Sequence, residues 1–370
     1  MFHALPAPLS SIVPFAIVLG VLVFVHEMGH YLAARWCGVH VEAFSIGFGR
    51  PIWSRTDRRG TVWRLSILPL GGYVKLHGQE RPEDATPEQR LAWQAGRTFH
   101  EKSVGRRAIV IAAGPIANFL LAAVLYAGLL GVLGRPSTLP VVSAVTAASA
   151  AANAGLQPGD RIEAIDGKPV ATFEDIFRYV SVRAHQSVSL LVRRGAGDLT
   201  LPATVGVRDA GGQQVGALGI TSTAVAYQPV SLPNAVVGGF VQVWEVTREW
   251  AVGLAQLISG NRGTEDLGGP LRIAQLSGQV AAAGVAALVS FIAVLSVNLG
   301  LINLVPIPIL DGGHLMFYAF EALRGRPLPQ RAQEYGYRAG LALIGALFVF
   351  VTWKDLGHLG VVHWVAGLLG

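Results

Sequence analysis

Charged residues are scarce in this chain. Asp, Glu, Lys and Arg make up 14% of the 370 residues, whereas hydrophobic residues make up 52% and the mean hydropathy is +0.47. A soluble domain usually carries about 25% charged residues, so the deficit indicates a membrane protein. The single cysteine, Cys37, excludes an internal disulfide framework. The net charge of +6 does not indicate nucleic-acid binding, because many basic residues fall in one loop between apolar runs.

Basic residues are absent before Arg35. The first apolar segment therefore lacks the basic start that a cleaved signal peptide needs. The following segment, 35–107, is rich in Arg and Lys, and basic residues gather on the cytoplasmic side of a membrane. We therefore expect an extracytoplasmic N-terminus and a cytoplasmic 35–107 loop.

Four apolar runs predict transmembrane helices, each of which needs about 20 residues. They are residues 12–34, 108–133, 284–310 and 339–353, the last being short and extended by its flanks. With the N-terminus outside, residues 135–280 and the C-terminus are also expected outside. The short loop before the fourth run then lies inside, as its arginines require; these are Arg324, Arg326, Arg331 and Arg338.

A fifth apolar run, 233–259, has a different character. It carries Glu245, Arg248 and Glu249 near its centre, and each charge at mid-bilayer costs a few kcal/mol. A fifth span would also place the four-arginine loop outside. We interpret this run as an amphipathic helix on or near the outer membrane surface.

The outer segment 138–226 has the pattern of a small globular domain. Turn signals occur at 157–160 and 166–167, and residues 173–182 have helical spacing. Three stretches are typical of strands: 161–165, 188–193 and 215–220.

The sequence His-Glu-Met-Gly-His at 26–30 carries the chemistry. His26 and His30 lie on one face of a helix, where two imidazoles can bind one zinc ion beside Glu27 as general base. Such a short pattern also arises by chance. Here it lies in an apolar span, where two histidines and a glutamate are costly and therefore indicate function.

A third ligand must come from elsewhere, because a catalytic zinc site uses three protein ligands and one open position. His40 and Glu42 are near in sequence but belong to the loop. Asp311 is the stronger candidate, because it ends an apolar run broken by prolines and glycines, and such backbone is tolerated at membrane depth only around a cavity. His314, three residues later, is the rival ligand.

Several motifs together resemble the site-2 protease family in its bacterial RseP-type, single-PDZ form. They are HEMGH at 26–30, GFG at 47–49, LPLGGYVK at 68–75, AGPIANF at 113–119, LGGP at 267–270 and SVNLGLINLVPIPILDGGH at 296–314. The resemblance covers nearly the whole chain. It implies Zn²⁺ held by His26, His30 and Asp311, with Glu27 as the catalytic carboxylate. It also implies that 138–226 is a PDZ domain, although the best-known relatives carry two.

The expected fold is a polytopic α-helical membrane protein with four transmembrane helices, a membrane-associated β-hairpin loop and one extracytoplasmic PDZ domain. Residues 1–137 hold the first two spans, the HExxH motif and a re-entrant β-loop on the cytoplasmic side. Residues 138–226 form the PDZ domain, 227–280 a surface helix and linker, and 281–370 the last two spans with the Asp ligand.

Substrate contacts are expected from the loop and from Asn303. Residues 43–49 and 61–68 have strand character, and such a hairpin, including Gly47, Phe48 and Gly49, can pair with an extended substrate by β-augmentation. A plain cytoplasmic hairpin is the alternative. Asn303, in an apolar helix, either holds the substrate backbone or serves helix packing.

The expected function is hydrolysis of a peptide bond within the transmembrane segment of a single-pass protein. By resemblance, substrates are pre-trimmed anti-sigma factors or signal-peptide remnants, and the location is the bacterial inner membrane. A PDZ receptor with a degenerate site is an alternative, against which the intact Glu27 argues. A metal transporter is another, but a path of further buried ligands is missing.

Overall fold

The computed structural model describes residues 7–79, 85–210, 213–261 and 268–358, and the chain ends lie outside these ranges. Two compact units emerge. One is Leu130–Leu232, and the other combines residues 1–129 and 233–370. We call the first the inserted unit and the second the helical unit.

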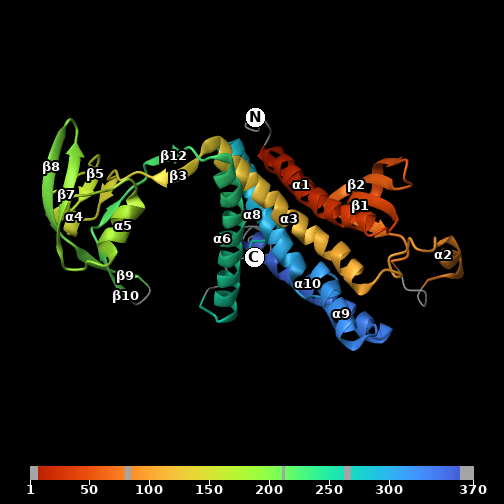
Figure 1. Cartoon of the computed structure of the whole chain (residues 1–370). Helices are drawn as coiled ribbons and strands as arrows, with labels where there is room; N and C mark the ends of the chain where they lie inside the picture. Colours follow the sequence, from red (N-terminus) through yellow and green to blue (C-terminus); the bar gives the residue numbers. More distant parts are fainter. Residues whose placement is uncertain (1–6, 80–84, 211–212, 262–267, 359–370) are drawn as a thin grey trace, which may run out of the picture. The chain divides into compact units, whose positions relative to one another are not determined.

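Four helices of the described chain are long and apolar enough to cross a membrane, by length and composition. They are α1 (Ala7–Trp36), α3 (Val104–Leu133), α8 (Val285–Leu304) and α10 (Gln330–His358); α1, α3 and α10 cover three of the predicted runs, and α8 covers most of the other. Figure 1 shows α1, α3 and α8 side by side. Val18 and Leu22 of α1 pack against Ile292 of α8, and Ala122 of α3 packs against Ala293. These contacts form the interior of the helical unit.

The third expected span is shorter than the sequence indicated. Helix α8 ends at Leu304, residues 305–310 form an irregular turn, and a new helix, α9 (Asp311–Arg324), begins at Asp311. Pro306 and Pro308 explain the break, since each lacks the backbone N–H that a continuing helix requires. Asp311 therefore starts a helix rather than ending one.

The run 233–259 forms helix α6 (Leu232–Ile258), which packs within the helical unit. A Cβ added at Gly239 meets the backbone oxygen of Ala123 on α3, so the two helices approach closely there. Val243 and Val246 continue this contact onto the cluster shared by α3 and α8. Two of its charged residues, Arg248 and Glu245, pair with each other, and their side chains are 69% and 46% exposed.

Helix α7 (Pro270–Ala283) is capped by a residue from the far end of the chain. The buried carboxylate of Asp355, on α10, accepts hydrogen bonds from the backbone N–H groups of Gly269, Leu271 and Arg272. Gly269 has no side-chain cap of its own. The carboxylate satisfies N–H groups that the first turn of a helix leaves unpaired. Its negative charge also interacts favourably with the positive end of the helix dipole of α7.

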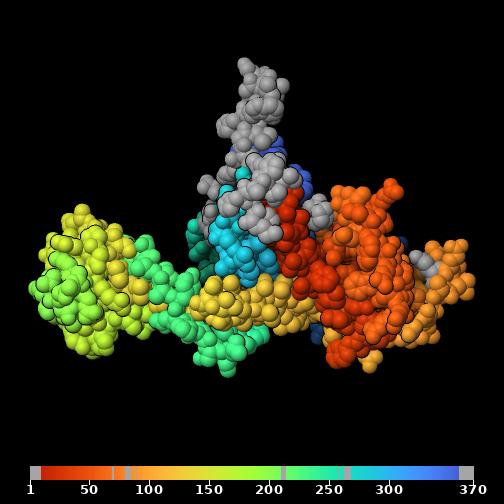
Figure 2. All heavy atoms as spheres, turned by 90° about the horizontal axis from the view of Figure 1, so that it is seen from above, coloured from red at the N-terminus to blue at the C-terminus, as the bar shows by residue number. Residues whose placement is uncertain are grey.

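The hairpin consists of two long strands, β1 (Val41–Thr56) and β2 (Val62–Leu76), that both bend. Residues 43–46 pair with 72–75 as well as with 62–65, while 51–56 pairs with 62–66. Gly47 and Gly49, both with φ +85°, and Gly71, with φ +134°, allow the bends. Both views place the hairpin against α1, in the red-to-orange part of the chain (Figures 1 and 2).

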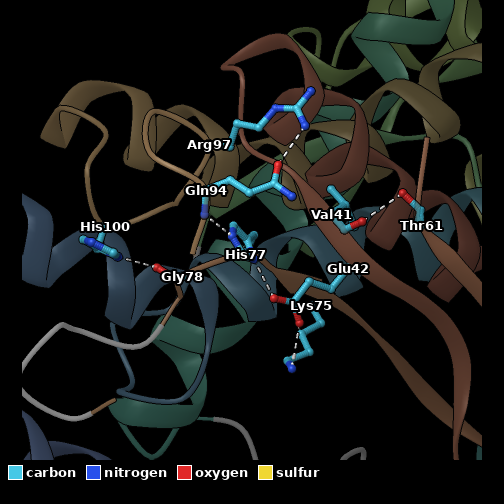
Figure 3. Close-up of polar contacts among 9 residues, drawn as sticks. All are labelled: Val41, Glu42, Thr61, Lys75, His77, Gly78, Gln94, Arg97 and His100. Carbon is cyan, nitrogen blue, oxygen red and sulfur yellow. Dashed lines mark hydrogen bonds and ion pairs between the residues drawn. The ribbon is translucent and has the colours of Figure 1, made fainter. Parts of the chain in front are cut away.

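Polar contacts fasten the loop that follows to the base of the hairpin (Figure 3). His77 lies 2.8 Å from Glu42 through Nδ1, and its Nε2 accepts a hydrogen bond from the backbone of Gln94. Burial raises the pKa of Glu42, but hydrogen bonds from Lys75 and His77 outweigh it and hold that pKa below its ordinary value. The loop, which contains the short helix α2 (Pro87–Ala92), is thereby tied to the hairpin.

The inserted unit is a mixed α and β domain around one apolar core. Its main sheet has the order β6-β5-β7-β8, formed by Lys168–Pro169, Arg161–Ile165, Ser187–Arg194 and Gly197–Thr204. Helices α4 (Ala150–Asn153) and α5 (Phe173–Ser181) contribute to the core, together with strand residues such as Leu190. The remaining strands pair as β3 (Arg135–Thr138) with β12 (Val225–Gln228), β4 (Ala144–Val145) with β11 (Ile220–Thr221), and β9 (Gly206–Ala210) with β10 (Gln213–Ala217).

Three predicted elements of this unit correspond closely to observed ones, namely β5, α5 and β7. The run 215–220 is instead divided between β10 and β11, with Gly219, at φ +80°, between them. Glycine takes that left-handed conformation without steric cost, and it interrupts the strand.

Candidate metal centre

Helix α1 presents three polar side chains to one cavity. His26, Glu27 and His30 are 9%, 8% and 8% exposed, although they lie in an apolar helix. The Nε2 atoms of the two histidines lie 3.2 Å apart, as expected for positions i and i+4 on one face. The helical spacing alone therefore accounts for this half of the site.

Asp311 approaches the same two nitrogens from the start of α9. Its Oδ2 lies 3.2 Å from Nε2 of His26 and 3.5 Å from Nε2 of His30. Gly312 and Gly313 follow, both buried, and a Cβ on either meets backbone oxygens of the preceding turn. Small residues after Asp311 thus let the start of α9 pack tightly against the end of α8 and the turn that joins them.

The three ligand atoms fit a zinc ion. Donors held about 2.0–2.2 Å from a tetrahedral zinc lie about 3.3–3.6 Å from one another, close to the 3.2, 3.2 and 3.5 Å observed here. The buried Oδ2 of Asp311 has no hydrogen-bond partner among the described residues. Two imidazoles and one carboxylate are also the donors that zinc prefers, and the set leaves a fourth position open.

His30 is held by helix α3. Its Nδ1 donates to the backbone oxygen of Val110 over 2.9 Å, which leaves Nε2 free for a metal. Its ring lies directly on Gly114, where an added Cβ would come within 2.2 Å of Nε2. The motif 113–119 therefore includes a glycine because no larger residue fits beneath the imidazole.

Asn118 is a site residue that sequence reasoning did not identify. It is fully buried on α3, and its Nδ2 lies 3.1 Å from Nδ1 of His26. The available signal was an amide inside an apolar span, which is costly without a partner.

A cavity of about 710 Å³ opens beside the three ligands. Glu27 lines it next to His26 and His30, and a Cβ on Gly72 would meet Cγ of Glu27 at 2.9 Å. Glycine at position 72 therefore lets the hairpin approach the Glu27 side chain closely. The other hairpin residues that line the cavity are Phe48, Gly71, Tyr73, Val74 and Leu76.

The predicted substrate residues fall at different distances from this cavity. Asn303 and Phe48 line it. Gly47 and Gly49 occupy the bend of β1, and the residues that line the cavity do not include them; a Cβ on Gly47 would meet the backbone oxygen of Leu68. Most of the hairpin residues that line the cavity belong to 71–76, and the role of 47–49 in substrate binding stays a prediction.

His314, the rival ligand, lines the cavity but stands apart from the three-ligand group. Its Nδ1 lies 3.4 Å from the hydroxyl of Tyr337 on α10. The structure thus favours Asp311 over His314 as the third donor.

This chain is similar to known proteins over most of its length. Residues 14–347 match the family model described as "Peptidase family M50". A relative from Agrobacterium fabrum, provisionally named a zinc metalloprotease, is 45% identical over 94% of this chain and 96% of its own. "Metalloprotease MmpA" of Caulobacter vibrioides is 37% identical over 97% of this chain and 98% of its own. "Regulator of sigma-E protease RseP" of Salmonella typhimurium is 32% identical over 95% of this chain and 99% of its own.

Among solved structures, the PDZ domain of an SdrC-like protein from Listeria monocytogenes is similar to part of this chain. It is 23% identical, with a TM-score of 0.21, over 22% of this chain and 85% of the other.

Proposed function

Because the chain belongs to peptidase family M50, and is a metalloprotease with membrane-type helices, we propose that it cuts a peptide bond within the transmembrane segment of its substrate. The observation that carries the proposal is the position of His26, His30 and Asp311, whose ligand atoms all lie within 4.8 Å of one another. Helix α1, which carries both histidines, and helix α3, which contacts His30, are each long and apolar enough to span a bilayer.

Each side chain has a distinct role in the proposed reaction. A zinc ion held by His26, His30 and Asp311 supplies the Lewis acidity that hydrolysis of an amide needs. Glu27 removes a proton from the attacking water, whose oxygen bonds to the carbonyl carbon. The same carboxyl then gives its proton to the leaving nitrogen as the C–N bond breaks. Burial of Glu27 beside the ligands suits this exchange.

The substrate backbone is proposed to lie along the hairpin. A transmembrane helix satisfies its own backbone groups, so it must unwind before cleavage, and the freed groups then need partners. Residues 72–76 pair with β1 on one side, and Gly71, Gly72 and Tyr73 line the cavity. This edge is placed to add an extended strand beside Glu27. Asn303 also lines the cavity, and its side-chain amide is proposed to make a further polar contact with the substrate backbone.

The proposed substrates are single-pass proteins of the bacterial inner membrane. The relative named as a regulator of sigma-E protease supports anti-sigma factors that another protease has already trimmed, and signal-peptide remnants are the second class. The basic 35–107 segment supports a cytoplasmic position for the hairpin. The inserted unit and both termini are then extracytoplasmic.

The test is cleavage by the purified full-length protein in lipid vesicles. A single-pass helix with helix-weakening residues near its middle is expected to be cut inside the apolar segment, with the position read by mass spectrometry. Glu27→Gln is expected to retain zinc and to lose at least about 100-fold in rate, because a proton acceptor is lost and not a ligand. Wild-type turnover by this variant, or cuts confined to soluble tails, would overturn the proposal.

The inserted unit is proposed to be a PDZ domain that restrains access rather than performing chemistry. Its sheet order and the single helix between β6 and β7 support this, and it contains none of the proposed ligands. Deletion of 138–226 is expected to preserve cleavage of a short substrate and to increase cleavage of one with a large outer domain. Loss of all activity in a deletion protein that still binds zinc would contradict this role.

A further inference from the structure

Asn118 is a buried polar residue that contacts His26 and that the proposed reaction does not use. We propose that Asn118 positions His26 for zinc binding, and that Ser296 holds Asn118 in place. The inference rests on the proposed metal site and assigns to this amide a role through His26, without contact to the substrate.

The contact is short and fully enclosed. Asn118 is 0% exposed, and its side-chain amide lies 3.1 Å from Nδ1 of His26. The other end of the amide, Oδ1, has no hydrogen-bond partner among the described residues. An unpaired buried carbonyl costs about 1–3 kcal/mol, so a residue kept only for helix packing is poorly served by an amide here.

Metal chemistry explains why an amide is needed. A neutral imidazole that binds zinc through Nε2 carries its hydrogen on Nδ1, and that N–H needs an acceptor. A half-turn of the Asn118 amide exchanges its two ends and brings the unpartnered Oδ1 to Nδ1 of His26. The acceptor then fixes the tautomer in which Nε2 is free for the metal.

His30 shows the same arrangement with a different acceptor. Its Nδ1 donates to the backbone oxygen of Val110, two turns before Asn118 on the same helix. Helix α3 therefore orients both imidazoles, one through its backbone and one through a side chain. The acceptor for His30 is a backbone oxygen, which any residue at position 110 supplies. The acceptor for His26 is a side-chain atom, so it depends on the residue type at position 118.

Ser296 connects this contact to the helix that leads to Asp311. Its hydroxyl, itself fully buried on α8, donates to the backbone oxygen of Asn118 over 2.8 Å. Helices α1, α3 and α8 thus meet at one level through His26, Asn118 and Ser296. This hydrogen bond fixes the position of Asn118 along α8 and leaves the side-chain amide of Asn118 available for His26.

The test compares Asn118→Asp and Asn118→Leu in the full-length protein in detergent. Zinc affinity is measured by competition with a chelator, and visible absorption of the cobalt(II)-loaded protein reports the ligand geometry. Asn118→Leu is expected to lower zinc affinity about 10- to 100-fold and to change the cobalt spectrum. Asn118→Asp keeps an acceptor oxygen and is expected to stay within a few-fold of wild type with an unchanged spectrum.

Serine variants keep the inference testable if Asn118→Leu fails to fold. Ser296→Ala is expected to weaken zinc binding a few-fold. Ser277→Ala is the control, because Ser277 is equally buried but donates only to Ile273 within α7. Wild-type affinity in Asn118→Leu, equal losses in the Leu and Asp variants, or equal effects of the two serine changes would overturn the inference. A wild-type protein that binds no zinc would instead overturn the proposed function, and the inference with it.

Discussion

One buried carboxylate in each unit, Asp311 in the helical unit and Asp160 in the inserted unit, has its acceptor atoms satisfied in a different way. In the inserted unit, Asp160 is 1% exposed and accepts hydrogen bonds from two nitrogens of Arg194 and from the backbone of Gln157. In the helical unit, Asp311 is also largely buried, but it faces two imidazoles that have no proton to spare once a metal binds, and its Oδ2 has no hydrogen-bond partner among the described residues.

This difference in hydrogen bonding separates a carboxylate that stabilises the fold from one that is placed to bind a ligand. A buried carboxylate with its acceptor sites filled stabilises the fold around it, as Asp160 does for the turn before β5. A buried carboxylate with an open lone pair destabilises the fold unless a ligand arrives. Such local conflicts are expected at functional sites, and the unpartnered Oδ2 of Asp311 beside His26 and His30 is a conflict of this kind.

The largest effect on zinc binding and cleavage is expected from substitution of Asp311, the carboxylate with the unpartnered oxygen. Asp311→Asn replaces an anionic oxygen by a neutral amide, and a site with an open position needs three firm protein ligands. Zinc content is expected to fall, and cleavage to fall roughly 100-fold or more. His314→Ala is the matched control and is expected to retain zinc. Elemental analysis of both purified proteins decides the matter, and the reverse pattern would transfer the third-ligand role to His314.

A smaller effect is expected where the helices touch. Gly114→Ala pushes a methyl group into the ring of His30 and displaces Nε2. Zinc affinity is expected to fall about 10-fold or more, by analogy with the loss of a ligand-orienting partner. Gly128→Ala on the same helix meets nothing within 4 Å, so it is expected to bind zinc normally. Chelator competition compares them, and equal behaviour of the two variants would show that the contact is unimportant.

The smallest expected effect concerns the closed carboxylate. Asp160→Asn is expected to destabilise the inserted unit by about 2 kcal/mol, the scale of a charge-assisted hydrogen bond. The hydrogen bond from Arg194 is the main reason that the pKa of Asp160 lies below its ordinary value. Its stabilisation is therefore complete above the unfolded pKa of about 3.9 and is lost as pH falls through the folded pKa.

Hydrogen exchange of amides in β7 of the full-length protein measures this effect. The gap between wild type and Asp160→Asn is expected to be constant at neutral pH and to close in acid. Asp198→Asn is the control, because Asp198 is half-exposed and its pair with Arg193 contributes little. A gap that widens in acid would contradict the assigned sign.

Local pattern made the helical half of the metal site predictable. The spacing of His26 and His30 places both on one face whatever surrounds them, and the apolar runs yielded the four long helices. Asp311 was predicted from its motif, but its position at the start of a new helix depends on the turn made by Pro306 and Pro308.

Contacts between distant segments were not predictable from local pattern. The glycine beneath His30 and the amide beside His26 both depend on how α3 crosses α1. The doubled pairing of the hairpin is another case, since sequence alternation indicates strands but not that β1 folds between two parts of β2. Helix α6 was expected from its pattern, yet its contact with α3 through Gly239 was not.

The cap that Asp355 provides has a mechanical consequence. Helix α10 holds the start of α7, α7 packs against α1 at Gly278, and α10 also presses Gly340 onto Pro308 in the turn that leads to Asp311. These elements form a closed linkage, in which no member can swing outward without straining the next. The base of the hairpin packs against α1 and α3, whereas residues 48–56 of β1 are exposed, so compliance of the cavity wall is expected at that outer end.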